Sequence, residues 1–125
     1  MANSASLSFS VAATMDSGGK IAGSKSLTIV PTGDDVLTTT QSVGTSAAAL
    51  SLGTLTSTTA KCIIVLAATA NASTVQVGTD QGGTKYYENS LEAGEFCVIC
   101  PKAGETFYVL GGAASQEFTT FAFQV

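Results

Sequence analysis

The residues with the clearest potential for chemistry are two cysteines separated by two residues, Cys97 and Cys100. On a loop, this spacing can bind zinc or form a redox-active pair. Here both cysteines belong to the apolar run Phe96–Cys100, which is typical of a β-strand. Because residues three apart on a strand point to opposite faces, the two sulfur atoms are poorly placed to bind one metal ion. We therefore predict no metal site, and we interpret these cysteines, with Cys62, as reduced thiols that pack like small apolar side chains.

The rest of the sequence offers no recognisable catalytic arrangement. It contains no histidine, which is the most frequent general base and metal ligand, so none of its serines has an imidazole to activate it. The adjacent carboxylates Asp34 and Asp35 fall in a predicted turn, where acidic side chains are usually solvated. The glycine-rich stretch Gly18–Ser26 lacks the spacing of a phosphate-binding loop. We therefore predict that the protein is not an enzyme and binds no cofactor.

Composition narrows the possible partners of this 125-residue chain, whose length suits one domain. Charged residues make up only 11% of it, and the net charge is −4. Nucleic-acid binding needs a basic surface that displaces counterions from phosphates, so we predict no nucleic-acid partner. The longest apolar run, Cys62–Ala68, is too short to cross a bilayer, so we predict no membrane partner. Residues Met1–Ser6 lack the features of a secretion signal, and we expect the protein to stay in the cell that makes it unless it leaves inside a particle.

Apolar and polar residues alternate with a period of two along most of the chain, as expected for β-strands with one buried face. The continuous apolar run within Lys61–Ala68 predicts a central strand that is covered on both faces. In the last segment, Phe121, Phe123 and Val125 share one face. Residues 45–50 either form a short helix or a loop of small residues that leads into a strand. The predicted strands lie within residues 6–11, 26–30, 36–43, 50–55, 61–68, 74–77, 86–87, 96–100, 106–109 and 118–125.

About eight to ten short strands with no helical segments between them predict an all-β protein, a single-domain antiparallel β-sandwich that is jelly-roll-like. We assign residues 25–125 to the sandwich and the Gly/Ser-rich residues 1–24 to an N-terminal arm or edge strand. Leu7, Phe9 and Val11 alternate with polar or small residues in this arm, which predicts a strand that needs a partner in the same sheet or in a neighbouring subunit. These three residues, together with the aromatic residues Tyr86 and Tyr87, are our candidate interaction residues.

The order of turns and strands from about Gln41 to the end resembles a class of small β-sandwich proteins encoded among the virion genes of tailed phages. Some head decoration (cement) proteins of such phages are jelly rolls of similar length. The resemblance implies a structural role in a phage particle and localisation in the virion, after synthesis in the cytoplasm of the host bacterium. It is carried by the segments Gln41–Thr45, Ala49–Gly53, Val75–Gly78, Asp80–Gly83, Leu91–Phe96 and Phe107–Val109.

Within this class, we expect a decoration protein that binds the major capsid protein on the outside of the head and stabilises it. A surface with little charge suits close contacts, and a mildly acidic protein is repelled by packaged DNA. We expect a homo-oligomer, and a trimer would match the threefold positions of an icosahedral shell. Two alternatives stay open: a virion protein of the tail, neck or fibre base, and a module that binds carbohydrate or a host surface through Tyr86, Tyr87 and Tyr108.

Overall fold

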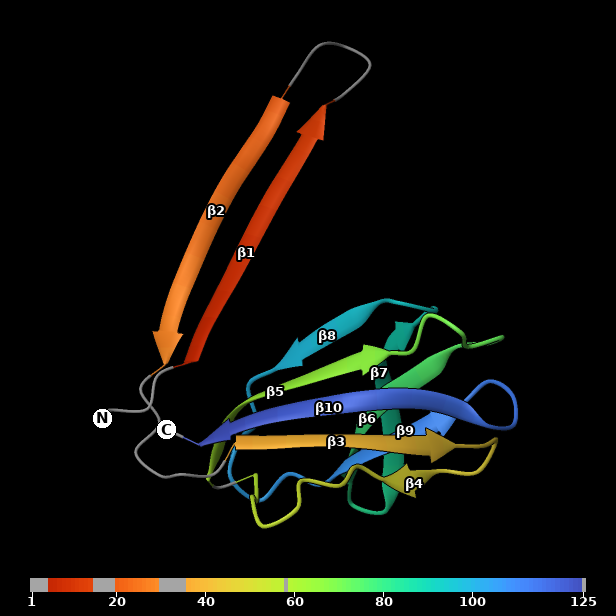
Figure 1. The fold of residues 1–125 in the computed structure, drawn as a ribbon. Coiled ribbons are helices and arrows are strands. Elements are labelled where there is room, and N and C mark those ends of the chain that lie inside the picture. The colour runs from red at the N-terminus through yellow and green to blue at the C-terminus, as the bar shows by residue number, and fades with distance from the viewer. Residues whose placement is uncertain (1–4, 15–19, 30–35, 58, 125) are drawn as a thin grey trace. The chain divides into compact units, whose positions relative to one another are not determined.

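The computed structural model in Figure 1 describes residues 5–14, 20–29, 36–57 and 59–124. The chain divides into two compact units, of which the first comprises residues 1–34 with Val125 and the second residues 35–124. The predicted boundary between residues 24 and 25 lies inside a strand of the first unit.

The first unit contains a two-stranded antiparallel hairpin. β1 (Ala5–Thr14) pairs with β2 (Lys20–Ile29) in one unbroken register from Ala5↔Ile29 to Thr14↔Lys20. The candidate interaction residues Leu7, Phe9 and Val11 occupy alternate positions of β1, and their register partners in β2 are Leu27, Lys25 and Gly23. Among the strands that the structure describes, none joins this pair as a third neighbour.

The second unit is a sandwich of two four-stranded antiparallel sheets, which confirms the predicted all-β fold. In Figure 1 the strands β3, β10, β5 and β8 run side by side as one sheet, and the second sheet lies behind them. The first sheet has the order β3 (Val36–Val43), β10 (Gln116–Gln124), β5 (Ala60–Ala67) and β8 (Phe96–Ile99). The second has the order β4 (Ala48–Ala49), β9 (Phe107–Gly111), β6 (Val75–Gln81) and β7 (Thr84–Leu91).

The connections pass back and forth between the two sheets. Consecutive strands from β3 to β10 lie in different sheets, except for β6 and β7, which form a hairpin. Gly82 and Gly83 make the turn of this hairpin, and both have the positive φ that glycine adopts without steric cost. Because each crossing carries the chain to the opposite layer, neither sheet forms from one continuous stretch of sequence.

The hydrophobic core fills the space between the two sheets. Strand β10 contributes Phe118, Thr120 and Ala122 to it, and all three are buried. The prediction that Phe121 and Phe123 share one face agrees with the strand register, but that face points away from the core; Val125 lies outside the described residues. The fully buried aliphatic residues of the core are Ile63, Val65, Val75, Val77 and Val109.

Two local predictions were wrong. The run in β5 was expected to be covered on both faces, yet Leu66 is 36% exposed, because the structure places a sheet on only one side of this strand. The strand expected at residues 50–55 is a loop that follows the two-residue strand β4. Leu50 and Leu55 of this loop are buried in the core, so their spacing reflects burial and not a strand. Residues 45–47 form a small-residue loop that leads into the two-residue strand β4, so the segment matches the second of the two alternatives and not the short helix.

Candidate protein-interaction surface

The outer face of the first sheet carries a continuous set of apolar side chains. Strand pairing places Ile64 of β5 between Phe121 of β10 and Val98 of β8. One row away, Leu66 lies directly opposite Phe96. Since directly opposed residues in an antiparallel sheet point to the same face, these side chains form one surface. We call this surface the outer apolar face, and it comprises Ile64, Leu66, Phe96, Val98, Phe121 and Phe123.

The outer apolar face is accessible and uncharged. Phe96 is 55% exposed, and Ile64, Val98, Phe121 and Phe123 are only partly buried. Three successive rows across β10, β5 and β8 hold nine residues when the β5–β8 register is continued by one residue beyond Ile99, and none of them is charged. They are the six apolar residues together with Thr119, Cys62 and Cys100. The first charge along β10 is the exposed Glu117, one row beyond these three. Contiguous accessible apolar surfaces are common where proteins bind other molecules, which makes this face a candidate interaction surface.

The edge strand next to this face is also unprotected. β3 pairs with β10 through an unshifted register from Val36 to Val43, and it carries no charge and no proline. The hydroxyl groups of Thr40 and Thr119 lie 3.1 Å apart on the outer side, which fixes the two strands side by side. A long, regular, uncharged edge strand presents unpaired backbone groups to which another strand can add.

The outer face of the second sheet is different. Lys85 Nζ lies 3.6 Å from Asp80 Oδ2 and 4.4 Å from the centre of the Tyr108 ring. Strand β7 at the edge of this sheet carries Lys85 and Glu88, and its pairing with β6 is interrupted by a register shift at Gly78. Charges and bulges are the features that protect edge strands from unwanted pairing. The second sheet is therefore protected where the first is open.

Tyr86 and Tyr87, two of the predicted interaction residues, belong to β7 of this second sheet. Tyr86 is 49% exposed, whereas Tyr87 is partly buried. They lie opposite Thr79 and Gly78 and, as neighbours on a strand, they point to opposite faces. They do not form one surface with each other, and they lie on a different sheet from the outer apolar face. Leu7, Phe9 and Val11 belong to the other unit.

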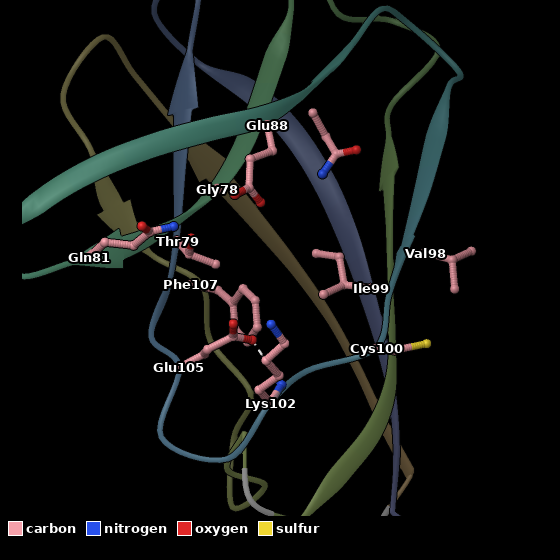
Figure 2. Close-up of a pocket in the computed structure, with 11 residues that line it drawn as sticks. Gly78, Thr79, Gln81, Glu88, Val98, Ile99, Cys100, Lys102, Glu105 and Phe107 are labelled. Carbon is pink, nitrogen blue, oxygen red and sulfur yellow. Dashed lines mark hydrogen bonds between the residues drawn. The ribbon is translucent and has the colours of Figure 1, made fainter.

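A polar cleft opens between the edge strands β7 and β8. Its volume is about 370 Å³, and Figure 2 shows Glu88, Thr79, Phe107 and Ile99 around it. At its rim, the backbone N–H of Lys102 donates a hydrogen bond of 2.8 Å to Glu105 Oε2. Within the described part of the chain, no group of three or more histidine, cysteine or acidic residues is placed to hold a metal ion. The cleft has no arrangement to which we can assign chemistry.

The cysteines are distributed as the strand argument predicted. Cys97 points into the core and is buried, whereas Cys100 is exposed, so the two lie on opposite faces. The interpretation as packed apolar side chains therefore holds for Cys62 and Cys97 but not for Cys100. Burial raises the pKa of the Cys97 thiol, and it raises the pKa of Cys62, to which nearby Cys100 adds.

Comparison with known proteins gives no match to a protein-family model, a curated protein or a solved structure. Among the described residues there is no helix with the length and hydropathy to span a bilayer. The outer apolar face is therefore the feature on which a functional proposal must rest.

Proposed function

We propose that the protein is a structural component of a phage particle, a decoration protein that binds the outside of the head and stabilises it. The observation that carries this proposal is the outer apolar face, which is accessible, uncharged and bordered by an open edge strand. Such a surface costs free energy as long as it faces water, and covering it is favourable. The resemblance of the sequence to small virion proteins of tailed phages supports the particle as the place where it is covered.

The strand pairing supports the finer part of the fold prediction, the jelly roll. β3 pairs with β10, β4 with β9, β5 with β8 and β6 with β7, which is the pairing of one long antiparallel ribbon folded at the β6–β7 turn. Rolling up such a ribbon brings β10 beside β5 and β9 beside β6, as observed. Jelly rolls of eight strands are used in viral capsid and lectin domains. The fold by itself does not determine function, but it is compatible with a role in a virion.

The size of the outer apolar face indicates how it would be used. Three strands about 4.8 Å apart and three rows about 6.7 Å apart span roughly 300 Å². Covering this area contributes about 7 kcal/mol at about 25 cal/mol per Å². That is comparable with the free energy lost on association, so one face alone holds a partner weakly. Lasting attachment requires several faces acting together, which favours a homo-oligomer.

The partners follow from this argument. We propose that the surface binds the major capsid protein and that the protein itself forms a homo-oligomer, a trimer in the arrangement that fits the threefold positions of a head. The net charge of −4 supports a position on the exterior, since packaged DNA would repel it. Mechanically, each copy would add buried area across the junction between capsomers and raise the free energy needed to separate them.

The proposal is tested by mixing the purified protein with expanded heads that lack it and measuring co-sedimentation. We expect the wild-type chain to bind and Phe96→Lys to bind at least tenfold more weakly, because a charge in the outer apolar face must be desolvated. Tyr86→Lys is a matched control, since both residues are exposed aromatics on edge strands and Tyr86 lies on the other sheet. Failure of the wild-type chain to bind, or equal binding by both variants, would rule out this function for this face. The number of copies per particle then separates a head coat, with hundreds, from a tail or neck ring.

A further inference from the structure

Two of the three cysteines lie opposite each other across neighbouring strands. The register between β5 and β8 pairs Leu66 with Phe96 and, three steps further on, Ile63 with Ile99. Continuing this register by one residue places Cys62 opposite Cys100. Ile63 and Ile99 pack into or against the core, so alternation along the strands places the two cysteines on the outer side of the sheet, where Cys62 is buried and Cys100 is exposed. Figure 2 agrees, because the side chains of Val98 and Cys100 both point away from the interior cleft.

The spacing of such a pair suits a disulfide bond. Directly opposed residues in an antiparallel pair have Cα atoms about 4.5–5.5 Å apart. Disulfides join Cα atoms that are about 4.4–6.8 Å apart, so the bond requires little movement of the backbone. The influence of Cys100 on the pKa of Cys62 is a separate sign that the two thiols lie near each other. Cys97 is on the opposite face of β8, pointing into the core, and is poorly placed to compete.

We propose that Cys62 and Cys100 are a redox-sensitive pair that forms a cross-strand disulfide and locks the edge strand β8 onto β5. The thiols are free in this structure. The bond forms when the protein meets a low-molecular-weight disulfide such as oxidised glutathione. This inference stands on the β5–β8 register and does not rest on the proposed role in a virion.

The reaction proceeds by two thiol–disulfide exchanges. The thiolate of the exposed Cys100 attacks one sulfur of oxidised glutathione, which forms a mixed disulfide and releases one glutathione thiolate. The thiolate of Cys62 then attacks Sγ of Cys100, and the second glutathione thiolate leaves. Two cysteine thiols are oxidised, one glutathione disulfide is reduced, and the two cysteine protons end on the two glutathione molecules. Because burial raises the pKa of Cys62, the second step accelerates as the pH rises and more thiolate is present.

The bond would stabilise the part of the molecule that carries the outer apolar face. β8 is a four-residue edge strand, and among the described strands it pairs with β5 alone. It nevertheless holds Phe96 and Val98, two residues of that face. The disulfide would enclose residues 63–99 and restrict the unfolded chain, which for a loop of this size raises the melting temperature by on the order of 10 °C.

The test uses the full-length chain, incubated with oxidised glutathione under native conditions and analysed by non-reducing peptide mapping and thermal unfolding. We expect one intramolecular Cys62–Cys100 link and a higher melting temperature that returns to its original value after reduction. Cys100→Ser should lose both the link and the shift, and because Cys100 is exposed this variant should fold normally. Cys97→Ser is the matched control and should keep the link.

Three outcomes would overturn the proposal. One is an oxidised wild-type chain in which Cys62 remains a free thiol while Cys100 carries a stable glutathione adduct. Another is a link that involves Cys97, and the third is a melting temperature that oxidation does not change although the link has formed. Peptide mapping reads the first two directly, so a variant that folds poorly does not obscure the result.

Discussion

The two sheets of the sandwich have the same number of strands but very different outer faces. On the first sheet, nine positions in three rows hold no charge, and Phe96 and Leu66 are the most exposed of its large side chains. On the second, Lys85 bridges Asp80 and the ring of Tyr108. Both sheets bury their inner faces in the same core, so the core does not cause the difference. In the proposed function, the first outer face is covered by a partner and the second faces water.

The edge strands of the two sheets show the same contrast in charge and regularity as the outer faces. The edge strand β3 of the first sheet is regular and uncharged, whereas β7 of the second carries charges and a register shift against β6. Proteins usually protect edge strands by such charges and irregularities. The hairpin β1–β2 is a two-stranded ribbon, which is marginally stable by itself in water. A chain with such a ribbon and an open edge has the parts that strand addition between subunits requires.

The largest loss of stability is expected from Gly78→Ala, which disturbs the register shift between β6 and β7 in the second sheet. A Cβ atom at Gly78 would lie 1.8 Å from the carbonyl oxygen of Tyr86, so the backbone of β7 would have to move. We expect a loss of about 3 kcal/mol or more in the free energy of unfolding. Gly44→Ala is the matched control, because nothing lies within 4 Å of an added Cβ there. Urea denaturation measures both, and equal stabilities would show that the register shift does not depend on this glycine.

The next effect concerns the first outer face, which in the absence of a head can be covered by a second copy of the chain, and Leu66→Lys tests this self-association. The wild-type chain should associate at concentrations where the variant remains dispersed, with a dissociation constant at least tenfold higher for the variant. Burying a leucine side chain contributes about 1.5–3 kcal/mol, which corresponds to that change. Because Leu66 is already 36% exposed, the free energy of unfolding of the Leu66→Lys variant should differ little from that of the wild-type chain. Sedimentation velocity tests this, with Tyr86→Lys as the control at an exposed aromatic residue away from the outer apolar face. Equal association by the two variants would contradict a role of the outer apolar face in this association.

Much of the fold could be predicted from the sequence, because alternation of apolar and polar residues reports a strand with one buried face. The same reasoning failed where both faces of a strand are apolar. In the sequence, Ile64 and Leu66 of β5 cannot be told apart from the buried Val65, because all three are apolar residues of one run. Periodicity does not show how many layers cover a strand. The outer apolar face was missed for this reason, although the two continuous apolar runs at β5 and β8 were the signal that could have revealed it.

Tyr86 and Tyr87 are predicted interaction residues because of their side-chain type, which does not specify location. Tyr86 and Tyr87 depend on the register of β7 against β6, and that register shifts at Gly78, where the partner of Val77 is Asn89 and the partner of Gly78 is Tyr87. Glu88 is the additional residue, and one extra residue in a strand exchanges the faces of those on its far side. A bulge of this kind has no clear sequence signature here, so the side to which each tyrosine points could not be predicted.

The smallest effect is expected from Lys85→Ala, which removes the charge contacts that distinguish the second outer face. Lys85 is partly exposed, and both its ion pair with Asp80 and its contact with the Tyr108 ring are weakened by solvent. We expect a loss of about 0.5–1 kcal/mol in the free energy of unfolding, smaller in concentrated salt because part of it is a screened ion pair. Lys102→Ala, at an exposed loop position, is the control and should change stability less. Chemical denaturation at low and high salt measures the free energy of unfolding of both variants. Sedimentation velocity shows whether Lys85→Ala self-associates more than the wild-type chain. If it does not, the charge of Lys85 stabilises the second sheet but is not needed to keep its outer face free of partners.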